Sequence, residues 1–180
     1  PAEADLASSV TISIGGFQNA IAGAVGRAQP LGAQAGDELR LVTSNSMAAG
    51  NAPEGAAGMV ETNVNIAAVT MNGDAITSCV IDAVQAQVSF DGQGQLLTDL
   101  SAPVPSKNDR GADYGMGAVS SIGKEWNEQA AAFAAYVTGK TLDEVAGIAV
   151  DEATKPAEAD LASSVTISIG GFQALLEKLR

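Results

Sequence analysis

One segment occurs twice in the chain, and this repeat limits the architecture more than any other feature. Residues 1–18 read PAEADLASSVTISIGGFQ, and residues 156–173 repeat them letter for letter. The offset of 155 residues far exceeds the roughly 20–50 residues of solenoid repeats, so the repeated unit is a whole domain. The sequence therefore predicts one unit of a tandem-repeat protein, bracketed by a piece of its neighbour.

The repeat also predicts domain boundaries. We interpret residues 1–26 as the tail (strand plus helix) of a preceding unit, residues 27–36 as a linker with Pro and Gly, and residues 37–180 as the complete domain. The β-branched residues of 162–168, and their equivalents in the first copy, predict a short strand before an amphipathic helix. The positions expected on the apolar helix face are Ile14, Phe17, Ile21 and Ala24 in the first copy, and Ile169, Phe172, Leu176 and Leu179 in the second.

The tail of residues 1–26 has an apolar helix face but lacks the body on which such a face should pack. One solution is docking against another molecule, by domain swapping or strand donation. The alternative is an arbitrary chain end that packs wherever it can. The sequence leaves both open.

The order of the remaining elements predicts an α+β fold, with a curved antiparallel sheet and two or three helices on one of its faces. We expect loops at residues 47–58 and 103–117. Asn72-Gly73 between β-rich runs is a strong hairpin signal. The expected strands are residues 38–44, 60–70, 75–84 with continued alternation to residue 90, and 95–98.

Two helices are expected after the sheet. The spacing of apolar residues predicts a helix over 124–138, which Gly139 ends. Thr141 and Glu144 form a capping box that opens a short second helix. The residues expected to face the core from the first helix are Trp126, Ala130, Phe133 and Val137.

The composition excludes several classes of function. A net charge of −12 disfavours nucleic-acid and peripheral membrane partners. With no histidine and a single cysteine, the chain cannot build a Ser-His-Asp or Cys-His nucleophile, a His-containing or multi-Cys zinc site, or a disulfide framework. We expect no metal, and we expect Cys79 to be a buried, inert thiol. No apolar stretch reaches the roughly 20 residues that span a bilayer, so direct membrane insertion is not expected.

Two motif matches are incomplete. Residues 117–124 (GAVSSIGK) have one residue too many between the glycines of a P-loop, and Glu125 follows where Ser or Thr should bind magnesium. Residues 121–124 match the Ser-x-x-Lys of penicillin-binding enzymes without the partner Lys-Thr-Gly motif. We assign no function to either.

A third match is more specific. In residues 160–166 (DLASSVT), Asp160, Ser163 and Thr166 have the spacing of Asp-x-x-Ser/Thr-Gly-Ala-Thr, and Ser168 and a helix follow. The segment resembles the flavinylation motif of the FMN-binding domain family, which occurs in secreted and membrane-associated redox proteins. The resemblance implies an FMN-binding-domain-like fold and a flavin transferase that attaches FMN, through its phosphate, to Thr166.

The implied cofactor site has support and two departures. A phosphate suits a helix N-terminus, where free N–H groups and the dipole favour negative charge. However, Ser164 replaces the family's Gly and Val165 its Ala, and both changes crowd the place where FMN would lie. If flavin binds, Tyr114 and Met116 are candidates to cover its ring, or they anchor their loop. The cofactor-binding residues that the resemblance implies are Asp160, Ser163, Ser164, Thr166 and Ser168, with Thr11 as the counterpart of Thr166 in the first copy.

Residues 111–130 and 148–152 are also similar to extracellular tandem-repeat proteins of anaerobic Gram-positive bacteria, which implies an extracellular or cell-surface location. Two hypotheses follow. The chain is an electron-transfer domain in which FMN does the chemistry. Alternatively, it is a non-catalytic surface or structural repeat without flavin that assembles through the duplicated segment. The expected partners are neighbouring repeat units or a second copy and, for the first hypothesis, the flavin transferase. Neither hypothesis requires a turnover enzyme.

Overall fold

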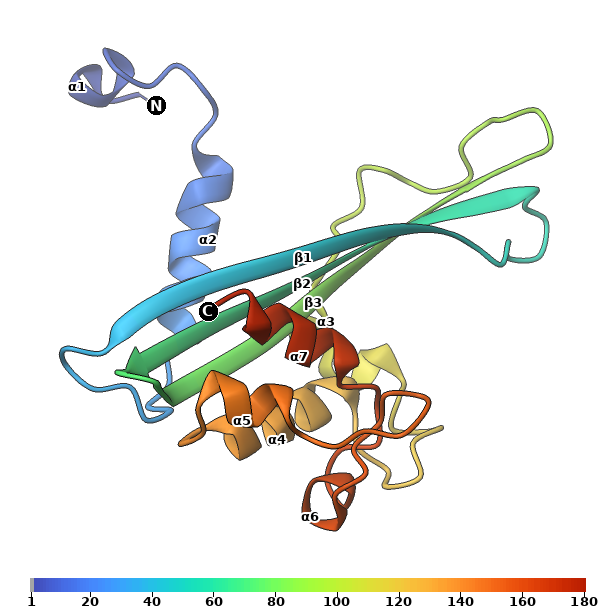
Figure 1. Ribbon diagram of the computed structural model, residues 1–180. Coiled ribbons are helices and arrows are strands. Elements are labelled where there is room, and N and C mark those ends of the chain that lie inside the picture. The colour runs from blue at the N-terminus through green and yellow to red at the C-terminus, as the bar shows by residue number, and fades with distance from the viewer. Residues whose placement is uncertain (1) are drawn as a thin grey trace. The chain divides into compact units, whose positions relative to one another are not determined.

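The computed structural model describes residues 2–180, which form two compact units (Figure 1). The first unit ends at Leu31 and holds two helices, α1 (Ala4–Ala7) and α2 (Gly15–Gly26). The second unit, Gly32–Arg180, holds the sheet and the other helices.

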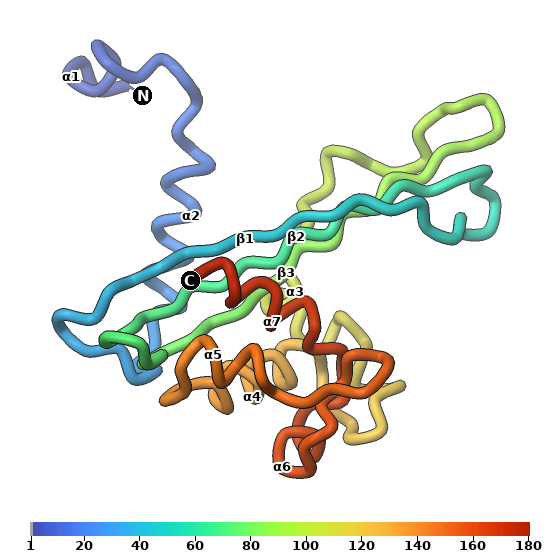
Figure 2. The backbone as a smooth tube through the Cα atoms, viewed as in Figure 1, coloured from blue at the N-terminus to red at the C-terminus, as the bar shows by residue number. Residues whose placement is uncertain are grey.

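Three antiparallel strands form the sheet in the order β1-β2-β3, and Figure 2 shows them side by side. Their bounds are β1 Glu38–Gly50, β2 Gly58–Asn72 and β3 Ala75–Phe90. Asn72 pairs with Ala75, so the β2–β3 turn consists of Gly73 and Asp74. Gly73 has a φ of 57°, which glycine adopts without steric cost. The predicted hairpin is confirmed, with its turn one residue further along the chain.

Three sequence predictions about loops and strands are wrong. Residues 47–50, predicted as loop, continue β1, because β2 offers each of them a partner, ending with Gly50 opposite Met59. Residues 95–98, predicted as a strand, contribute only an isolated bridge between Phe90 and Leu96. The predicted loop 103–117 contains two short helical turns, α3 (Lys107–Arg110) and η1 (Gly111–Tyr114).

The major helices pack on one face of the sheet (Figure 1). Helix α4 (Trp126–Val137) contacts β3, while α7 (Gly170–Glu177) contacts β1, β2 and α5 (Leu142–Ala146). The predicted helix over 124–138 is confirmed, and so is the capping box at Thr141. The chain is therefore α+β, with an open three-stranded meander covered by helices, as predicted.

The core lies between the sheet and these helices. The four residues predicted on the α4 face are all buried, and so is Cys79 from β3. Burial raises the pKa of the Cys79 thiol to about 12. The prediction that Cys79 is buried is confirmed. The other buried residues of β2 and β3 that form this core are Ala67, Val69, Met71, Ile76, Ile81 and Ala83.

Candidate functional site

Residues 2–18 and 157–173, the parts described in both copies, adopt the same backbone. Helix α1 in the first copy corresponds to α6 (Ala159–Ala162) in the second, and the residues before them, Glu3 and Glu158, have φ/ψ of −75°/128° and −76°/127°. The residues before α2 and α7, Ile14 and Ile169, share φ/ψ of −106°/−4°. The shared sequence therefore specifies its local conformation in two different surroundings.

Local hydroxyl bonds explain this conformation and correct the predicted strand. Neither residues 162–168 nor their equivalents in the first copy form a strand. Instead, Ser163 donates to the Asp160 carbonyl (2.7 Å) and Ser164 to the Leu161 carbonyl (3.2 Å). Hydroxyls that bond a preceding carbonyl favour turns over strands. The same bonds recur in the first copy, from Ser8 to Asp5 and from Ser9 to Leu6.

Burial distinguishes the two copies. We call residues 156–173 the closing copy and residues 1–18 the N-terminal copy. Leu161 and Phe172 of the closing copy are 1% and 5% exposed, whereas their counterparts Leu6 and Phe17 are 38% and 61% exposed. One amino-acid sequence with one local fold thus forms part of a core at one end of the chain and presents its apolar side chains to solvent at the other.

The closing copy packs on an aromatic surface of α4. The Phe172 ring lies edge-on to Trp126 at 5.9 Å between centroids and tilted against Phe133 at 5.4 Å. Such arrangements are preferred by aromatic pairs. Val165 and Ile169, which flank the turn before α7, are fully buried in the same core. Phe172 is therefore the main anchor of the closing copy.

A buried amide, Gln129 of α4, bonds the turn of the closing copy. Its Oε1 accepts from the Thr166 N–H (2.8 Å), the Ile167 N–H (3.2 Å) and the Thr166 hydroxyl (3.2 Å). Its Nε2 donates to the Lys124 carbonyl (2.9 Å) and the Ser120 hydroxyl (3.2 Å). Gln129 is completely buried, so this saturated network fixes the position of the turn.

Two further polar contacts hold the closing copy. The Tyr136 hydroxyl donates to the Glu158 carboxylate, a bond that lowers the pKa of Glu158 and raises that of Tyr136. Gln173 Nε2 donates to the carbonyls of Val145 (3.0 Å), in the last turn of α5, and Ile148 (3.1 Å), just beyond its end. We call the residues that receive the closing copy the seat: Trp126, Gln129, Phe133, Tyr136, Val145, Ile148 and Thr154.

Thr154 covers the start of α7. Its φ of 57° is unusual for a β-branched residue. Its carbonyl accepts from the Ile169 N–H (2.8 Å), and its hydroxyl bonds the Ser168 hydroxyl. A Cβ placed on Gly170 would lie 3.0 Å from the Thr154 side chain. Glycine at position 170 therefore permits this close contact.

The residues that the flavin resemblance implies do not form an open phosphate site in this arrangement. Gln129 occupies both the N–H and the hydroxyl of Thr166, and Thr154 covers the α7 N-terminus. The side chain that replaces the motif's Ala, Val165, is fully buried. Of the other implied residues, Asp160 is exposed on α6 and Thr11 is exposed in the first unit. This geometry does not fit FMN, and we derive no chemistry from it.

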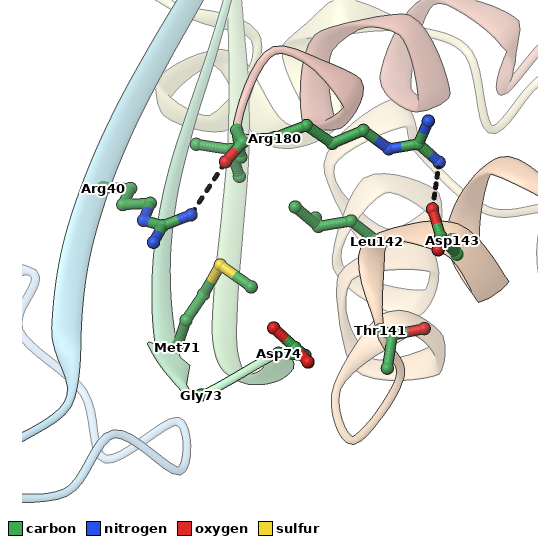
Figure 3. Close-up of a pocket in the computed structure, with 9 residues that line it drawn as sticks. Arg40, Met71, Gly73, Asp74, Thr141, Leu142, Asp143 and Arg180 are labelled. Carbon is green, nitrogen blue, oxygen red and sulfur yellow. Dashed lines mark hydrogen bonds and ion pairs between the residues drawn. The ribbon is translucent and has the colours of Figure 1, made fainter.

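A cavity of about 340 Å³ lies at the end of the sheet where α7 ends and α5 begins (Figure 3). Met71, Leu142 and Leu179 contribute its apolar walls. Its two arginines are both engaged, because Arg40 donates to the Leu179 carbonyl (2.7 Å) and Arg180 pairs with Asp143 (2.6 Å). The residues predicted to bind flavin do not line this cavity.

Gln129, whose side chain holds the turn of the closing copy, was not predicted from the sequence. A signal was present, because Gln129 lies between Trp126 and Phe133 on the stripe that was predicted to face the core. A polar residue on such a stripe requires buried partners. Its partners are 37 and 38 residues away along the chain, and the sequence did not indicate them.

Comparison of the chain with protein-family models, curated proteins and solved structures found no match. Among residues 2–180, no helix has the length and apolar character needed to cross a membrane. The same residues contain no cluster of three or more acidic or cysteine side chains placed to hold a metal ion.

Proposed function

We propose that this protein is a non-catalytic assembly repeat of an extracellular tandem-repeat protein. In each unit, one copy of the duplicated segment packs into the seat and completes the core; we call the sheet and helices that carry the seat the body. The N-terminal copy then docks into the seat of another unit of the same fold. The observation that carries this proposal is the contrast between Phe17 and Phe172, which have the same neighbours in sequence and the same backbone but are 61% and 5% exposed.

The apolar surface of the N-terminal copy provides the driving force. Each fully buried Leu, Val, Ile or Phe side chain contributes about 1.5–3 kcal/mol, so four such residues contribute about 6–12 kcal/mol as an upper estimate. The loss of translational and rotational entropy on association costs about 4–15 kcal/mol. The two terms nearly balance, so these four side chains alone bind weakly, whereas the segment of residues 156–180 adds the buried Leu175, Leu176 and Leu179. A tandem array removes most of the cost, because a tether raises the effective concentration to the order of millimolar. The four side chains are those of Leu6 and Phe17, which are exposed, and of Val10 and Ile14, which are already half-buried.

The acidic charge of the chain adds a dependence on salt. Units with a net charge of −12 repel one another, and this repulsion is screened within about 10 Å at 0.1 M salt. We therefore expect docking between units to strengthen as ionic strength rises, the opposite of an interface held by ion pairs.

The test asks whether the closing segment can enter a body from outside. The acceptor is the full chain with Phe172→Ala, which weakens its own closing copy, and Phe17→Asp, which disables its N-terminal copy. A synthetic peptide of residues 156–180 restores the missing ring, which is worth about 3–5 kcal/mol, or a factor of about 150 to 5,000. The acceptor's own altered closing copy competes with the peptide at an effective concentration of about millimolar. Half-saturation by the peptide is therefore expected at about 10 µM or below. Binding is measured as a rise in the Tm of the acceptor.

The matched control is the same peptide with Phe172→Asp, which should leave the Tm unchanged. If the unmodified peptide also fails to raise the Tm at 100 µM (about ten times the weakest expected half-saturation), the segment does not dock in trans and the assembly proposal is wrong.

The flavin hypothesis stays a prediction with its own test. A visible absorption spectrum of the protein from a host that carries the flavin transferase, followed by peptide mass spectrometry, reports FMN on Thr166 or Thr11. We expect a colourless protein of unmodified mass, because Gln129 and Thr154 occupy the groups that a phosphate would need. Flavin bands would restore the electron-transfer hypothesis.

A further inference from the structure

The two copies stop matching where the core packing continues. After the shared segment, the second copy reads ALLEKLR and the first reads NAIAGAV. In this alignment Ala20 replaces Leu175 and Ala24 replaces Leu179, while Ile21 replaces Leu176 at similar volume. Leu175 and Leu179 are 0% and 6% exposed, so both differences fall at buried positions.

We propose that the partner of the N-terminal copy is a related body rather than a second copy of this one, with larger side chains opposite the positions of Leu175 and Leu179. This inference rests on the proposed docking function and names the partner. A buried Leu→Ala change weakens packing by at least about thirtyfold. Two such changes disfavour entry of the N-terminal copy into this seat by about a thousandfold or more.

The end of the helix gives a second, independent reason. Helix α7 ends at Glu177, and the chain then turns so that the Leu179 carbonyl accepts from Arg40 (2.7 Å). Lys178 Nζ also donates to the Thr43 carbonyl (2.9 Å). Helix α2, which begins in the N-terminal copy, continues beyond it to Gly26 and has Gly23 in the position of Lys178. It can therefore make neither the turn contact nor the lysine contact with β1.

The cavity beside Leu179 shows where the partner must differ. Met71 and Leu142 line this cavity together with Leu179. With alanine in place of Leu179, one apolar wall of this open cavity would recede and the cavity would grow. A body that carries a larger side chain at position 71 or 142 would fill the space that Ala24 leaves. The shared segment thus supplies affinity, and its continuation supplies specificity.

The proposed contact between units is directional. A seat that rejects the N-terminal copy of its own kind cannot form a closed, self-complementary swap. It instead requires a heterologous contact, in which the N-terminal copy of one unit enters the seat of a different unit.

The experiment uses the acceptor defined above, the full chain with Phe17→Asp and Phe172→Ala, and three peptides of residues 1–25. These are the unmodified peptide, one with A20L/A24L, and one with A22L/V25L as the matched control, because the counterparts Glu177 and Arg180 are exposed. The A20L/A24L peptide should bind within tenfold of the peptide of residues 156–180. The unmodified and control peptides should bind at least a hundredfold more weakly.

Equal binding of the unmodified 1–25 peptide and the 156–180 peptide would overturn the inference while leaving the docking function intact. Failure of the 156–180 peptide to bind would instead remove the docking function itself. A second acceptor with L142F added tests the partner's seat. On this acceptor, the ratio of the Kd of the unmodified 1–25 peptide to the Kd of the 156–180 peptide should fall at least tenfold. An unchanged ratio would refute the assignment of Leu142 as a residue that differs in the partner.

Discussion

The repeat offers an internal control for the energetics of the fold, since one substitution can be made twice in the same sequence context. Phe172→Ala removes a ring that is 5% exposed and packs on Trp126 and Phe133. Phe→Ala in a core costs about 3–5 kcal/mol, out of a total stability of about 5–15 kcal/mol. Phe17→Ala removes a ring that is 61% exposed, and such surface changes stay within about 0.5 kcal/mol.

Urea denaturation followed by fluorescence measures both free energies of unfolding. Trp126 is the only tryptophan of the chain and lies edge-on to Phe172, so its emission reports on this part of the core. With an m value of about 1.5–2 kcal/mol per molar, Phe172→Ala should lower the midpoint by about 1.5–3 M urea. Phe17→Ala should leave the midpoint and m value unchanged.

The result that would refute this reasoning is a similar loss of stability in the two variants. It would mean that Phe17 is packed in the folded protein and that the N-terminal copy already has a partner. Phe172→Leu serves as a further control, because it keeps most of the apolar volume and should recover much of the loss.

Three other predictions concern single groups. Gln129→Leu leaves the backbone N–H groups of Thr166 and Ile167 without an acceptor, which costs about 1–3 kcal/mol each. Calorimetry should therefore show a loss of about 2–6 kcal/mol in the free energy of unfolding. An unchanged Tm would contradict the role of this amide. Because the Tyr136 hydroxyl lowers the folded pKa of Glu158, the stability that this carboxylate contributes is complete above its ordinary pKa of 4.5 and is lost as the pH falls through the folded pKa. Glu158→Gln should therefore flatten the acid limb of stability against pH. Because burial raises the pKa of Cys79 from 9.0 to about 12, stability should fall as the pH rises from 9 toward 12, and a thiol reagent at neutral pH should label Cys79 only in urea.

The parts of the fold that follow from local chemistry could be predicted from the sequence. The hairpin is specified by a turn that needs a positive φ at Gly73, and α5 by the reciprocal capping of Thr141 and Glu144. The stripe of α4 identified the core face because helical periodicity is a short-range property. Each of these signals lies within a few residues of the structure it specifies.

The rest depends on partners that are distant in sequence. Residues 48–50 have small side chains, and residues 47–50 become strand only because β2 lies beside them. The β-branched residues of 162–168 indicated a strand, but the hydroxyls of Ser163 and Ser164 close a turn first. Gln129 was missed because its three donors belong to the closing copy. Periodicity does not report such long-range contacts.

The placement of α7 beside β1 has a mechanical consequence. The C-terminus lies next to the strand that opens the second unit (Figures 1 and 2), and Arg40 and Thr43 of β1 bond the residues that follow α7. In an array of such units, tension would enter the second unit ahead of β1 and leave at Arg180. Such a load acts on the contacts that Leu179 and Lys178 make with β1, which break one after the other rather than together. Each unit would therefore yield first at its C-terminal end, by release of the residues that follow α7.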